Sequence, residues 1–401
     1  MTTHLDVGDP LLSRILGRER SLFTEDLACA RASLVDAIRG RRILVVGASG
    51  SIGGAFVRQL AGYAPQALHL VDLNENTLVE LVRDLRSSPL KLPDDFQTVS
   101  VDFGSVEFER FATLAGPYDV FVNFSAMKHV RSERDVYSLM RLLDVNIRAL
   151  ASFLARPAAS KLERAFSVST DKSVRPVNLM GASKNLMERV LFRHGSRVTT
   201  TSARFANVAF SAGSLLEGFE SRLAKRQAIA APTDVRRYFI SHEEAGQLCL
   251  LACFSGASRE VFFPKLTAER DLLGMADIAT LFLRHHGYEP LPCASEEEAR
   301  TLSHFPPGRW PCWFSPSDTT GEKPYEEFCR DDDNVDSGRY PSIAVVKESP
   351  PDESVLDTFL AELARMRQSR SWNKADVVDL IRVAVPELQH QELGRSLDLK
   401  M

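Results

Sequence analysis

Residues 43–54, ILVVGASGSIGG, decide the fold of this chain. The apolar run predicts a buried strand, and Gly47, Gly50 and Gly53 follow it where a helix pattern begins. Glycine lets a backbone approach a pyrophosphate closely, and the free N–H groups of a helix N-terminus attract anions. A nucleoside triphosphate loop is excluded, because Gly54 and not lysine follows Gly53. The stretch therefore predicts a dinucleotide-binding strand, turn and helix.

A second strand, ALHLVD at residues 67–72, ends in Asp72. This carboxylate follows the turn by about 20 residues, where it can accept a hydrogen bond from a ribose 2′-hydroxyl. Leu73 and Asn74 offer no arginine for a 2′-phosphate, so NAD is favoured over NADP. Asp102, after a third strand, either meets the adenine edge or caps the next helix. The residues expected at the cofactor are Gly47, Ser49, Gly50, Ser51, Ile52, Gly53, Asp72, Asn74, Asp102, Phe103, Ser125, Ala126 and Lys184.

Strand-like and helix-like segments continue to alternate along the chain. Further strand patterns are DVFVNFSA (119–126), RAFSVST (164–170) and RVTTTSARFANV (197–208), with helix patterns between them. This order predicts an α/β fold, a Rossmann-type doubly wound parallel sheet with helices on both faces.

The alternation also suggests how the chain is divided. Residues 1–40 form a helical preface expected to pack against the main domain, and residues 41–208 form the Rossmann domain. Beyond, Pro-rich and Gly-rich connections at 209–330 predict a smaller substrate-binding lobe, mixed with the sheet domain. Residues 331–401 read as an acidic, turn-rich loop followed by terminal helices.

Composition excludes several classes of protein. The net charge of −4 provides no basic field for nucleic acid or anionic lipid. No window approaches 18 uninterrupted apolar residues, so no membrane insertion is expected. The six cysteines include no C-x-x-C pair and no zinc-ligand spacing, which predicts no metal site. We expect a cytoplasmic protein.

The stretch RAFSVSTDKSVRPVNLMGASK, residues 164–184, carries the candidate chemistry. Asp171 and Lys172 follow the carboxyl end of a strand, where ligands sit in open α/β sheets. Met180 and Lys184 are four residues apart and share one face of the following helix. Taken alone, an Asp-Lys pair is more often a solvated ion pair in a loop.

This stretch, with SAMKHVRSERD (125–135) and TTGEKPYEEF (319–328), resembles the extended short-chain dehydrogenases of the CapD-like nucleotide-sugar 4,6-dehydratase group. Members of that group act on UDP-N-acetylglucosamine, and the resemblance spans residues 15–330. The closing segment SWNKADVVDLIRVAVPELQH also resembles members linked to nonulosonic acid or bacillosamine pathways.

The resemblance implies a reaction and roles for the residues. Hydride leaves C4 of the hexose for NAD, water is lost across C5 and C6, and the hydride returns to C6. Asp171 would be the acid at the C6 hydroxyl, Lys172 the base at C5, and Thr170 would hold the C4 oxygen. Lys184 would lie under the nicotinamide ribose. Met180 stands where short-chain dehydrogenases keep a tyrosine, and none of the seven tyrosines has a lysine four residues on; the C4 hydroxyl proton must therefore pass to Asp171, a water or the ribose.

The same resemblance implies a substrate site. Asn207 and Ser214 match positions that contact the uridine diphosphate, although Ala206 departs from the common RFGNV. Arg237 matches the arginine at the diphosphate, where a guanidinium suits phosphate oxygens. Substrate residues are expected to be Lys128, which also provides charge to the catalytic group, His129, Asn207, Ser214, Arg237 and Glu322. For Lys128 a surface role stays open, for His129 a structural one, and for Glu322 a simple turn.

Other readings stay open. A nucleotide-sugar 4-epimerase or a dehydrogenase of the same sugar class is a second possibility. An epimerase needs a proton relay at the C4 oxygen, normally a tyrosine, so Met180 argues against it. A non-catalytic, NAD-binding regulatory protein would not need Thr170, Asp171 and Lys172. We expect a homo-oligomer. The stripe Leu139, Leu142, Leu143 and Ile147 is the core face of a helix, or part of a helix-pair dimer contact.

Overall fold

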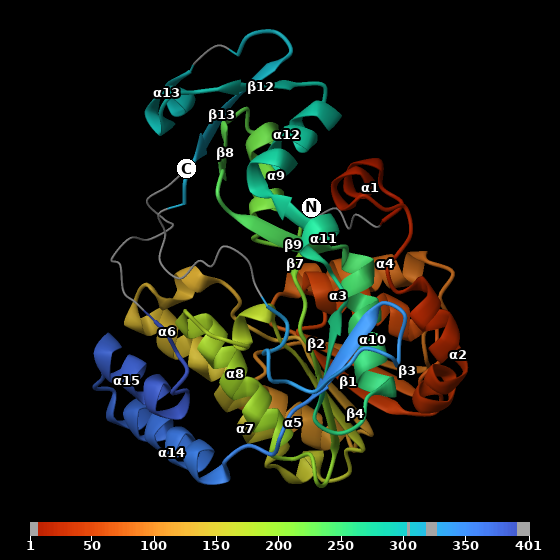
Figure 1. Cartoon of the computed structure of the whole chain (residues 1–401). Helices are drawn as coiled ribbons and strands as arrows, with labels where there is room; N and C mark the ends of the chain where they lie inside the picture. The colour runs from red at the N-terminus through yellow and green to blue at the C-terminus, as the bar shows by residue number, and fades with distance from the viewer. Residues whose placement is uncertain (1–6, 303–304, 318–326, 391–401) are drawn as a thin grey trace.

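A nine-stranded sheet forms the centre of the part of the chain that the structure describes, residues 7–302, 305–317 and 327–390 of a computed structural model (Figure 1). Its order is β14-β15-β10-β6-β5-β4-β1-β2-β3. The strands from β10 to β3 in this order are parallel, and β15 and β14 join antiparallel at one edge. These strands are β1 (Arg42–Val46), β2 (Ala67–Asp72), β3 (Asp95–Ser100), β4 (Val120–Asn123), β5 (Arg164–Val168), β6 (Thr199–Ala203), β10 (Glu260–Pro264), β14 (Val335–Asp336) and β15 (Ile343–Lys347).

Helices cover both faces of the sheet, which confirms the predicted fold class. Because side chains alternate along a strand, Ile43 and Val45 of β1 face one layer, and Leu44 and Val46 face the other. The first layer contains α2 (Thr24–Ile38), α3 (Ser51–Ala61), α4 (Glu75–Ser87) and α10 (His242–Ser255). The second contains α5 (Val106–Ala115), α6 (Val136–Leu143), α7 (Ala149–Leu154), α8 (Leu179–Phe192), α14 (Glu353–Ser369) and α15 (Lys374–Ala384), and a π-helical segment, Asp144–Arg148, joins α6 to α7.

The strand order reverses direction at β1. This strand pairs with β2 on one side and with β4 on the other, so the connections that follow β1 and β4 leave toward opposite faces. A crevice forms at the carboxyl ends of the strands at such a switch point, and ligands of open α/β sheets bind there.

The smaller lobe lies beyond the carboxyl ends of the strands (Figure 1). It contains two three-stranded sheets, β11-β9-β7 and β12-β13-β8, in the described residues. Phe210, Phe219, Phe282 and Trp310 belong to its separate hydrophobic core. Its elements are β7 (Asn207–Val208), α9 (Leu215–Ala224), β8 (Ile229–Pro232), β9 (Arg236–Ile240), α11 (Ala268–Asp271), β11 (Leu272–Gly274), α12 (Met275–His285), β12 (Glu289–Pro292), α13 (Glu296–Thr301) and β13 (Arg309–Ser315).

The N-terminal preface does not pack as one unit against the main domain. Leu34 and Ile38 of α2 join the core of the large sheet, whereas Leu12 and Ile15 of α1 (Pro10–Leu16) join the core of the smaller lobe. The apolar face of α1, formed by Leu11, Leu12, Ile15 and Leu16, is buried in the core of that lobe. Between the two helices, Arg18 forms an ion pair with the fully buried Glu244 of α10 at 2.8 Å.

The C-terminal part also differs from the expected acidic loop. Residues 343–347, IAVVK, form the buried strand β15, paired antiparallel with β10. Helix α15 then lies against α6 and α8, and α14 packs against α15 (Figure 1). The stripe Leu139, Leu142, Leu143 and Ile147 is completely buried within this chain, so it is core and not an exposed dimer surface. In the described residues no helix is long and apolar enough to cross a membrane.

Candidate functional site

The glycine turn after β1 packs too closely for any other residue at two of its positions. Gly47 has a φ of +68°, and a Cβ there would lie 2.4 Å from the main-chain nitrogen of Ser125. A Cβ at Gly53 would lie 2.2 Å from the carbonyl oxygen of Gly47. At Gly50 the nearest atom would be 3.5 Å away, an ordinary contact. The turn therefore has no room for a side chain at Gly47 or Gly53, whereas a Cβ would fit at Gly50.

Two adjoining cavities open at the carboxyl ends of the strands. The larger, of about 660 Å³, lies between the glycine turn, the 3₁₀ turn Asp171–Ser173 after β5, and the segment after β6. The smaller, of about 360 Å³, lies beyond the ends of β1, β2 and β3. They meet at the glycine turn, because both are lined by Gly47, Gly50, Phe124, Ala126 and Met127. An elongated ligand can extend across the turn from one cavity into the other.

The smaller cavity carries two carboxylates. Asp72 accepts hydrogen bonds from the main-chain nitrogens of Ser49 at 2.9 Å and Asn74 at 3.0 Å, which fixes its carboxylate beside the turn. Asp102 accepts from the nitrogen of Gly104 at 3.0 Å and forms an ion pair with Arg141. Burial raises the pKa of Asp102, but these two contacts outweigh it and the pKa is lowered. The cap of α5 is Ser105, so the alternative role of Asp102 as a helix cap is wrong.

Most residues expected at the cofactor line one of the two cavities, and two do not. Ser49 and Asn74 are absent from both linings as the described residues delimit them. The Ser49 hydroxyl lies 2.7 Å from Thr77 Oγ1, and the Asn74 side chain accepts from the nitrogen of Thr77 and caps α4. They hold the turn and helix in place. The lining residues are Gly47, Gly50, Ser51, Ile52, Gly53, Asp72, Asp102, Phe103, Ser125, Ala126 and Lys184, and their free N–H groups, small residues and carboxylates fit a dinucleotide.

The Asp-Lys pair of the sequence lies in the larger cavity. Thr170, Asp171 and Lys172 line it together with Met180 and Lys184 of α8. Thr170 Oγ1 donates to Asp171 Oδ1 at 2.7 Å, and Lys172 Nζ lies 3.1 Å from the same oxygen. The Asp171 side chain is only 3% exposed, so this is not a solvated ion pair in a loop.

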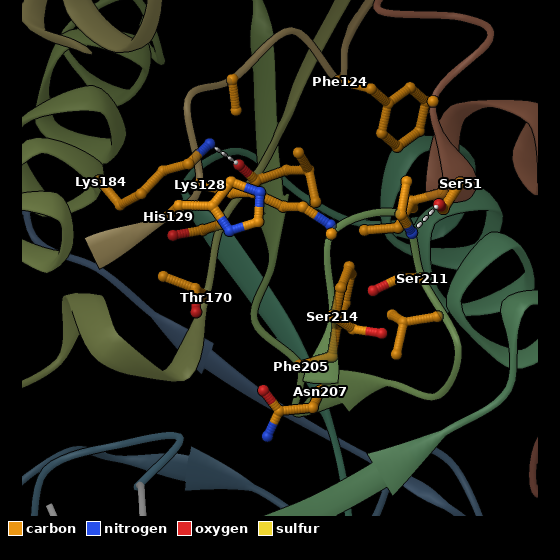
Figure 2. Close-up of a pocket in the computed structure, with 18 of the residues that line it drawn as sticks. Ser51, Phe124, Lys128, His129, Thr170, Lys184, Phe205, Asn207, Ser211 and Ser214 are labelled. Atoms are coloured by element: carbon orange, nitrogen blue, oxygen red, sulfur yellow. Dashed lines mark hydrogen bonds between the residues drawn. The ribbon is translucent and has the colours of Figure 1, made fainter. Parts of the chain in front are cut away.

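Lys184 is buried beside the cavity. Its Nζ donates to the carbonyl oxygen of Val168 at 2.9 Å (Figure 2). Burial lowers its pKa to about 8, against the opposing charge of Glu188. An ammonium group with such a pKa titrates within the pH range of most enzymes.

Lys128 and His129 reach the larger cavity from the segment after β4 (Figure 2). Asn146, in the π-helical segment, holds this segment by accepting from the nitrogen of Met127 at 2.8 Å and donating to its oxygen at 3.0 Å. Lys128 is open to the cavity, but the surrounding protein desolvates its amino group and lowers its pKa. The same cause lowers the pKa of His129, and the charge of Lys128 adds to it.

The other four predicted substrate residues divide into three groups. Asn207 and Ser214 line the larger cavity (Figure 2), and Asn207 Nδ2 is buried without a hydrogen-bond partner among the described residues. Arg237 is buried in β9 and lines neither cavity as the described residues delimit them, and its Nη1 donates to the carbonyl of Arg236 at 2.9 Å. Glu322 lies outside the described residues.

Several lining residues were not foreseen. Phe205, Ser211 and Gly213 come from the segment after β6, and Ser51 accepts a hydrogen bond from the nitrogen of Ala212 at 3.0 Å. Among them, the glycine at position 213 was the one signal in the sequence. The structure explains this glycine, because its φ is +72° and a Cβ there would lie 2.7 Å from the His129 ring.

The charge of the larger cavity favours an anion. Lys128, Lys172 and Lys184 line it, and Asp171 is the carboxylate among its described lining residues. An excess of ammonium groups in a cleft with low-dielectric walls attracts phosphate-bearing ligands.

Proteins with related sequences include one named for polysaccharide biosynthesis and one named as a nucleotide-sugar dehydratase. The probable polysaccharide biosynthesis protein EpsC of Bacillus subtilis is 24% identical over 366 residues, which cover 89% of this chain and 57% of EpsC. The UDP-N-acetylglucosamine 4,6-dehydratase (inverting) of Campylobacter jejuni serotype O:23/36 is 26% identical over 236 residues, which cover 57% of this chain and 67% of that protein. The chain thus spans little more than half the length of EpsC.

A solved structure supports the fold. The Bordetella bronchiseptica enzyme WbmG in complex with NAD is similar with a TM-score of 0.52 at 16% identity, over 72% of this chain and 85% of WbmG. The family resemblance inferred from the sequence is confirmed by the family profile itself. Because the family described as polysaccharide biosynthesis protein matches residues 43–348, more than half of the chain, this protein belongs to that family.

Proposed function

We propose that this protein is an NAD-dependent nucleotide-sugar 4,6-dehydratase. Its proposed substrate is UDP-N-acetylglucosamine and its product a UDP-4-keto-6-deoxy-N-acetylhexosamine, for a bacterial surface polysaccharide or a nonulosonic acid or bacillosamine-type sugar. The observation that carries the proposal is the position of Asp171 and Lys172, which line one cavity with the glycine turn and Lys184. Met180 lines it too and cannot exchange a proton.

The proposal assigns the two cavities to the two halves of NAD. Asp72 and Asp102 would meet the adenosine half, Gly47 and Gly50 the pyrophosphate, and Lys184 the nicotinamide ribose. When bound, NAD would supply the redox chemistry, as acceptor of the hydride from C4 of the sugar and as its donor to C6. The complex of WbmG with NAD and the fit of the lining residues support this cofactor.

In the elimination, Lys172 takes the proton from C5, and Asp171 gives a proton to the C6 hydroxyl, which leaves as water. The pair enters this step with one proton, on Asp171, and leaves it as a carboxylate beside an ammonium. Nζ and Oδ1 lie 3.1 Å apart in the structure, and the proton of an Asp171–Lys172 ion pair must pass to solvent before Lys172 can act as the base. Lys172 then returns its proton to C5.

The proton of the C4 hydroxyl needs an acceptor because Met180 replaces the tyrosine. Thr170 donates to Asp171 at 2.7 Å, so a proton released at the C4 oxygen can reach Asp171 through the Thr170 hydroxyl. This route puts on Asp171 the proton that the elimination then uses, and the proton count over the cycle balances.

For substrate recognition, the proposal places the diphosphate near the lysines of the larger cavity, with Asn207 and Ser214 close to the nucleotide. The unpartnered Asn207 amide gives a donor for this purpose. The roles of Arg237 and Glu322 at the nucleotide stay predictions.

The function is tested by incubating the purified protein with UDP-N-acetylglucosamine in deuterium oxide. We expect deuterium at C5 of a 4-keto-6-deoxy product and no net NADH. Release of an isomer without loss of water would instead identify an epimerase, accumulation of NADH a dehydrogenase, and no conversion across a panel of nucleotide sugars a binding protein. Asp171→Asn and Lys172→Ala should both retain NAD and lose turnover; normal turnover in either variant would refute its assigned role.

A further inference from the structure

Helix α8 contacts the 3₁₀ turn after β5 along one stripe of its surface. Gly181, Asn185 and Glu188 are four and three residues apart and share one face of the helix. A Cβ at Gly181 would lie 2.4 Å from the carbonyl oxygen of Lys172. Asn185 Nδ2 donates to the Ser173 oxygen at 3.0 Å, and Ser173 Oγ lies 3.0 Å from Glu188 Oε1. The neighbouring stripe of the helix, Met180 and Lys184, lines the larger cavity, so one helix serves both the turn and the ligand space.

The Ser173 hydroxyl links this stripe to the start of the turn. It donates to the carbonyl oxygen of Thr170 at 2.7 Å and accepts from the Ser169 hydroxyl at 3.3 Å. A hydroxyl has one proton, so the Glu188 carboxylate and the Thr170 carbonyl share a single donor. A shift of Glu188 therefore changes the hydrogen bond from Ser173 to Thr170, the residue next to Asp171.

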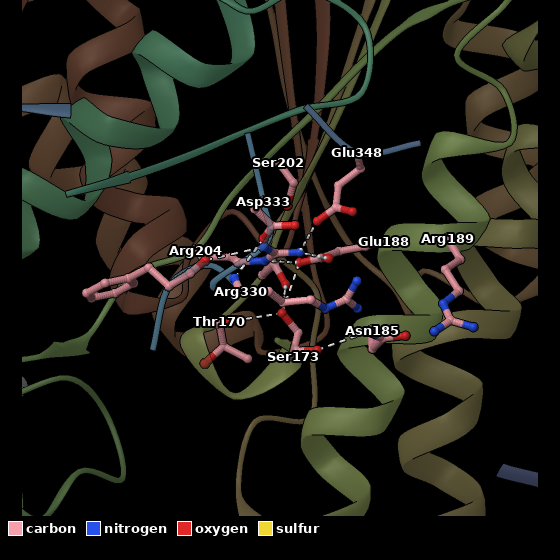
Figure 3. Close-up of polar contacts among 12 residues, drawn as sticks. Thr170, Ser173, Asn185, Glu188, Arg189, Ser202, Arg204, Arg330, Asp333 and Glu348 are labelled. Carbon is pink, nitrogen blue, oxygen red and sulfur yellow. Dashed lines mark hydrogen bonds and ion pairs between the residues drawn. The ribbon is translucent and has the colours of Figure 1, made fainter. Parts of the chain in front are cut away.

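Arg204, just after β6, fixes Glu188 in turn (Figure 3). Its Nε lies 2.9 Å from Glu188 Oε1 and its Nη2 lies 2.5 Å from Oε2, a two-pronged contact, and the Arg204 and Glu188 side chains are 3% and 4% exposed. The same Nη2 lies 2.8 Å from Glu348, directly after β15. Arg204 thus ties the helix that holds the turn to the far edge of the sheet.

The cost of desolvating two charges makes this pair a weak source of stability, because apolar residues of equal volume commonly stabilise a core as well. Its geometry, however, is directional: a guanidinium and a carboxylate in two-pronged contact allow one orientation. Groups that handle protons need such orientation, since a displacement of about 1 Å can lower a rate roughly a hundredfold.

We propose that Glu188, clamped by Arg204, is a positioning residue, which with Asn185 holds the 3₁₀ turn so that Asp171 and Lys172 reach the ligand in the larger cavity. This inference rests on the proposed function. The buried Glu188–Arg204 pair would support proton transfer by Asp171 and Lys172 without itself contacting the substrate.

The test compares Glu188→Gln and Ser173→Ala with a matched control, Ser202→Ala. Ser202 is equally buried and donates to the Ser167 oxygen at 2.7 Å, the same length as the Ser173 bond to Thr170, but it holds no part of the turn. We expect kcat to fall roughly tenfold to a hundredfold in Glu188→Gln and Ser173→Ala. KM and NAD content should stay within about twofold, and Ser202→Ala should keep the wild-type kcat even if it melts earlier.

A second measurement does not need turnover. The turn has its own amide bonds, from Ser173 to Thr170 at 3.2 Å and from Val174 to Asp171 at 3.3 Å. In ligand-free protein, amide hydrogen exchange at Ser173 and Val174 should be roughly tenfold faster in both variants, with exchange in β4 unchanged. If the wild type converts no nucleotide sugar, the proposed function fails and exchange alone decides the positioning role. If Glu188→Gln does not fold, Ser173→Ala decides it. Wild-type exchange of the turn and wild-type kcat in a folded variant would overturn the inference.

Discussion

Alanine at Gly50 and alanine at Gly53 should separate binding of the cofactor from folding of its turn. The two glycines lie three residues apart in one turn, but their surroundings differ. A methyl group at Gly53 would meet the Gly47 oxygen at 2.2 Å, about 1 Å closer than such atoms normally approach. The backbone would have to move, and we expect Gly53→Ala to lower the free energy of unfolding by about 1–3 kcal/mol.

Gly50→Ala should fold normally. Gly50 has φ −65° and ψ 165°, which alanine adopts freely, and its Cβ would lie 3.5 Å from the nearest atom. The net change in the free energy of unfolding should therefore stay within about 1 kcal/mol. Gly50 lines both cavities, however, so the methyl group would enter the space between them. We expect NAD to bind at least tenfold more weakly, which corresponds to about 1.4 kcal/mol.

The assay pairs urea denaturation with calorimetric titration of NAD into cofactor-free protein. We expect Gly53→Ala to be destabilised, and Gly50→Ala to be stable but to bind NAD weakly. A stable Gly50→Ala variant that binds NAD like the wild type would show that the pyrophosphate does not lie on this turn.

Three further predictions concern charged groups. Asp72→Asn should weaken NAD binding roughly tenfold, because a charge-assisted hydrogen bond to the ribose is lost. It should also reduce the preference for NAD over NADP, and titrations with each cofactor measure the two affinities. The folded pKa of Lys184, about 8, lies below its ordinary value of 10.5, so between these two pH values the unfolded chain binds the proton more tightly and stability rises with pH. Urea denaturation at a series of pH values should show this rise in the free energy of unfolding, about 3 kcal/mol, in cofactor-free wild type, and Lys184→Met should lack it. Parallel curves for the two proteins would contradict the lowered pKa of Lys184. Arg18→Ala should lower the free energy of unfolding by about 3 kcal/mol, because it leaves the buried Glu244 carboxylate without its cation; a loss below about 1 kcal/mol would mean that solvent reaches this carboxylate.

Local patterns predicted the large sheet well. The apolar run 43–46, the glycines after it and the alternation of strand and helix patterns up to residue 208 depend on neighbours in sequence, and the structure confirms the fold that they indicate. Strand β15 was missed because its apolar residues lie within an acidic, turn-rich stretch, and its partner β10 is about 80 residues earlier in the chain. The same holds for part of the site: Gly47 and Asp171 follow strands and Asp72 ends one, so the sequence could place all three.

Other contributors had no such signal. Glu188 stands in a helix pattern and Arg204 in a strand pattern, and nothing in either pattern marks the charge as buried. The burial appears only when β6 lies beside α8. Phe205 and Ser211 line the cavity because the segment after β6 turns back over it, a path that depends on the smaller lobe. Predictions of this kind require knowledge of which distant elements meet.

The N-terminal segment bears on how a ligand could enter and leave. Helix α1 belongs to the smaller lobe and α2 to the sheet, and Arg18 between them touches both, through the Phe239 oxygen of β9 at 3.3 Å and Glu244 of α10. A rotation that moves the smaller lobe away from the sheet must therefore extend the segment between α1 and α2 or break the contacts of the Arg18 guanidinium. The contacts that resist such a rotation are thus made by Arg18, Phe239 and Glu244, which line neither cavity as the described residues delimit them.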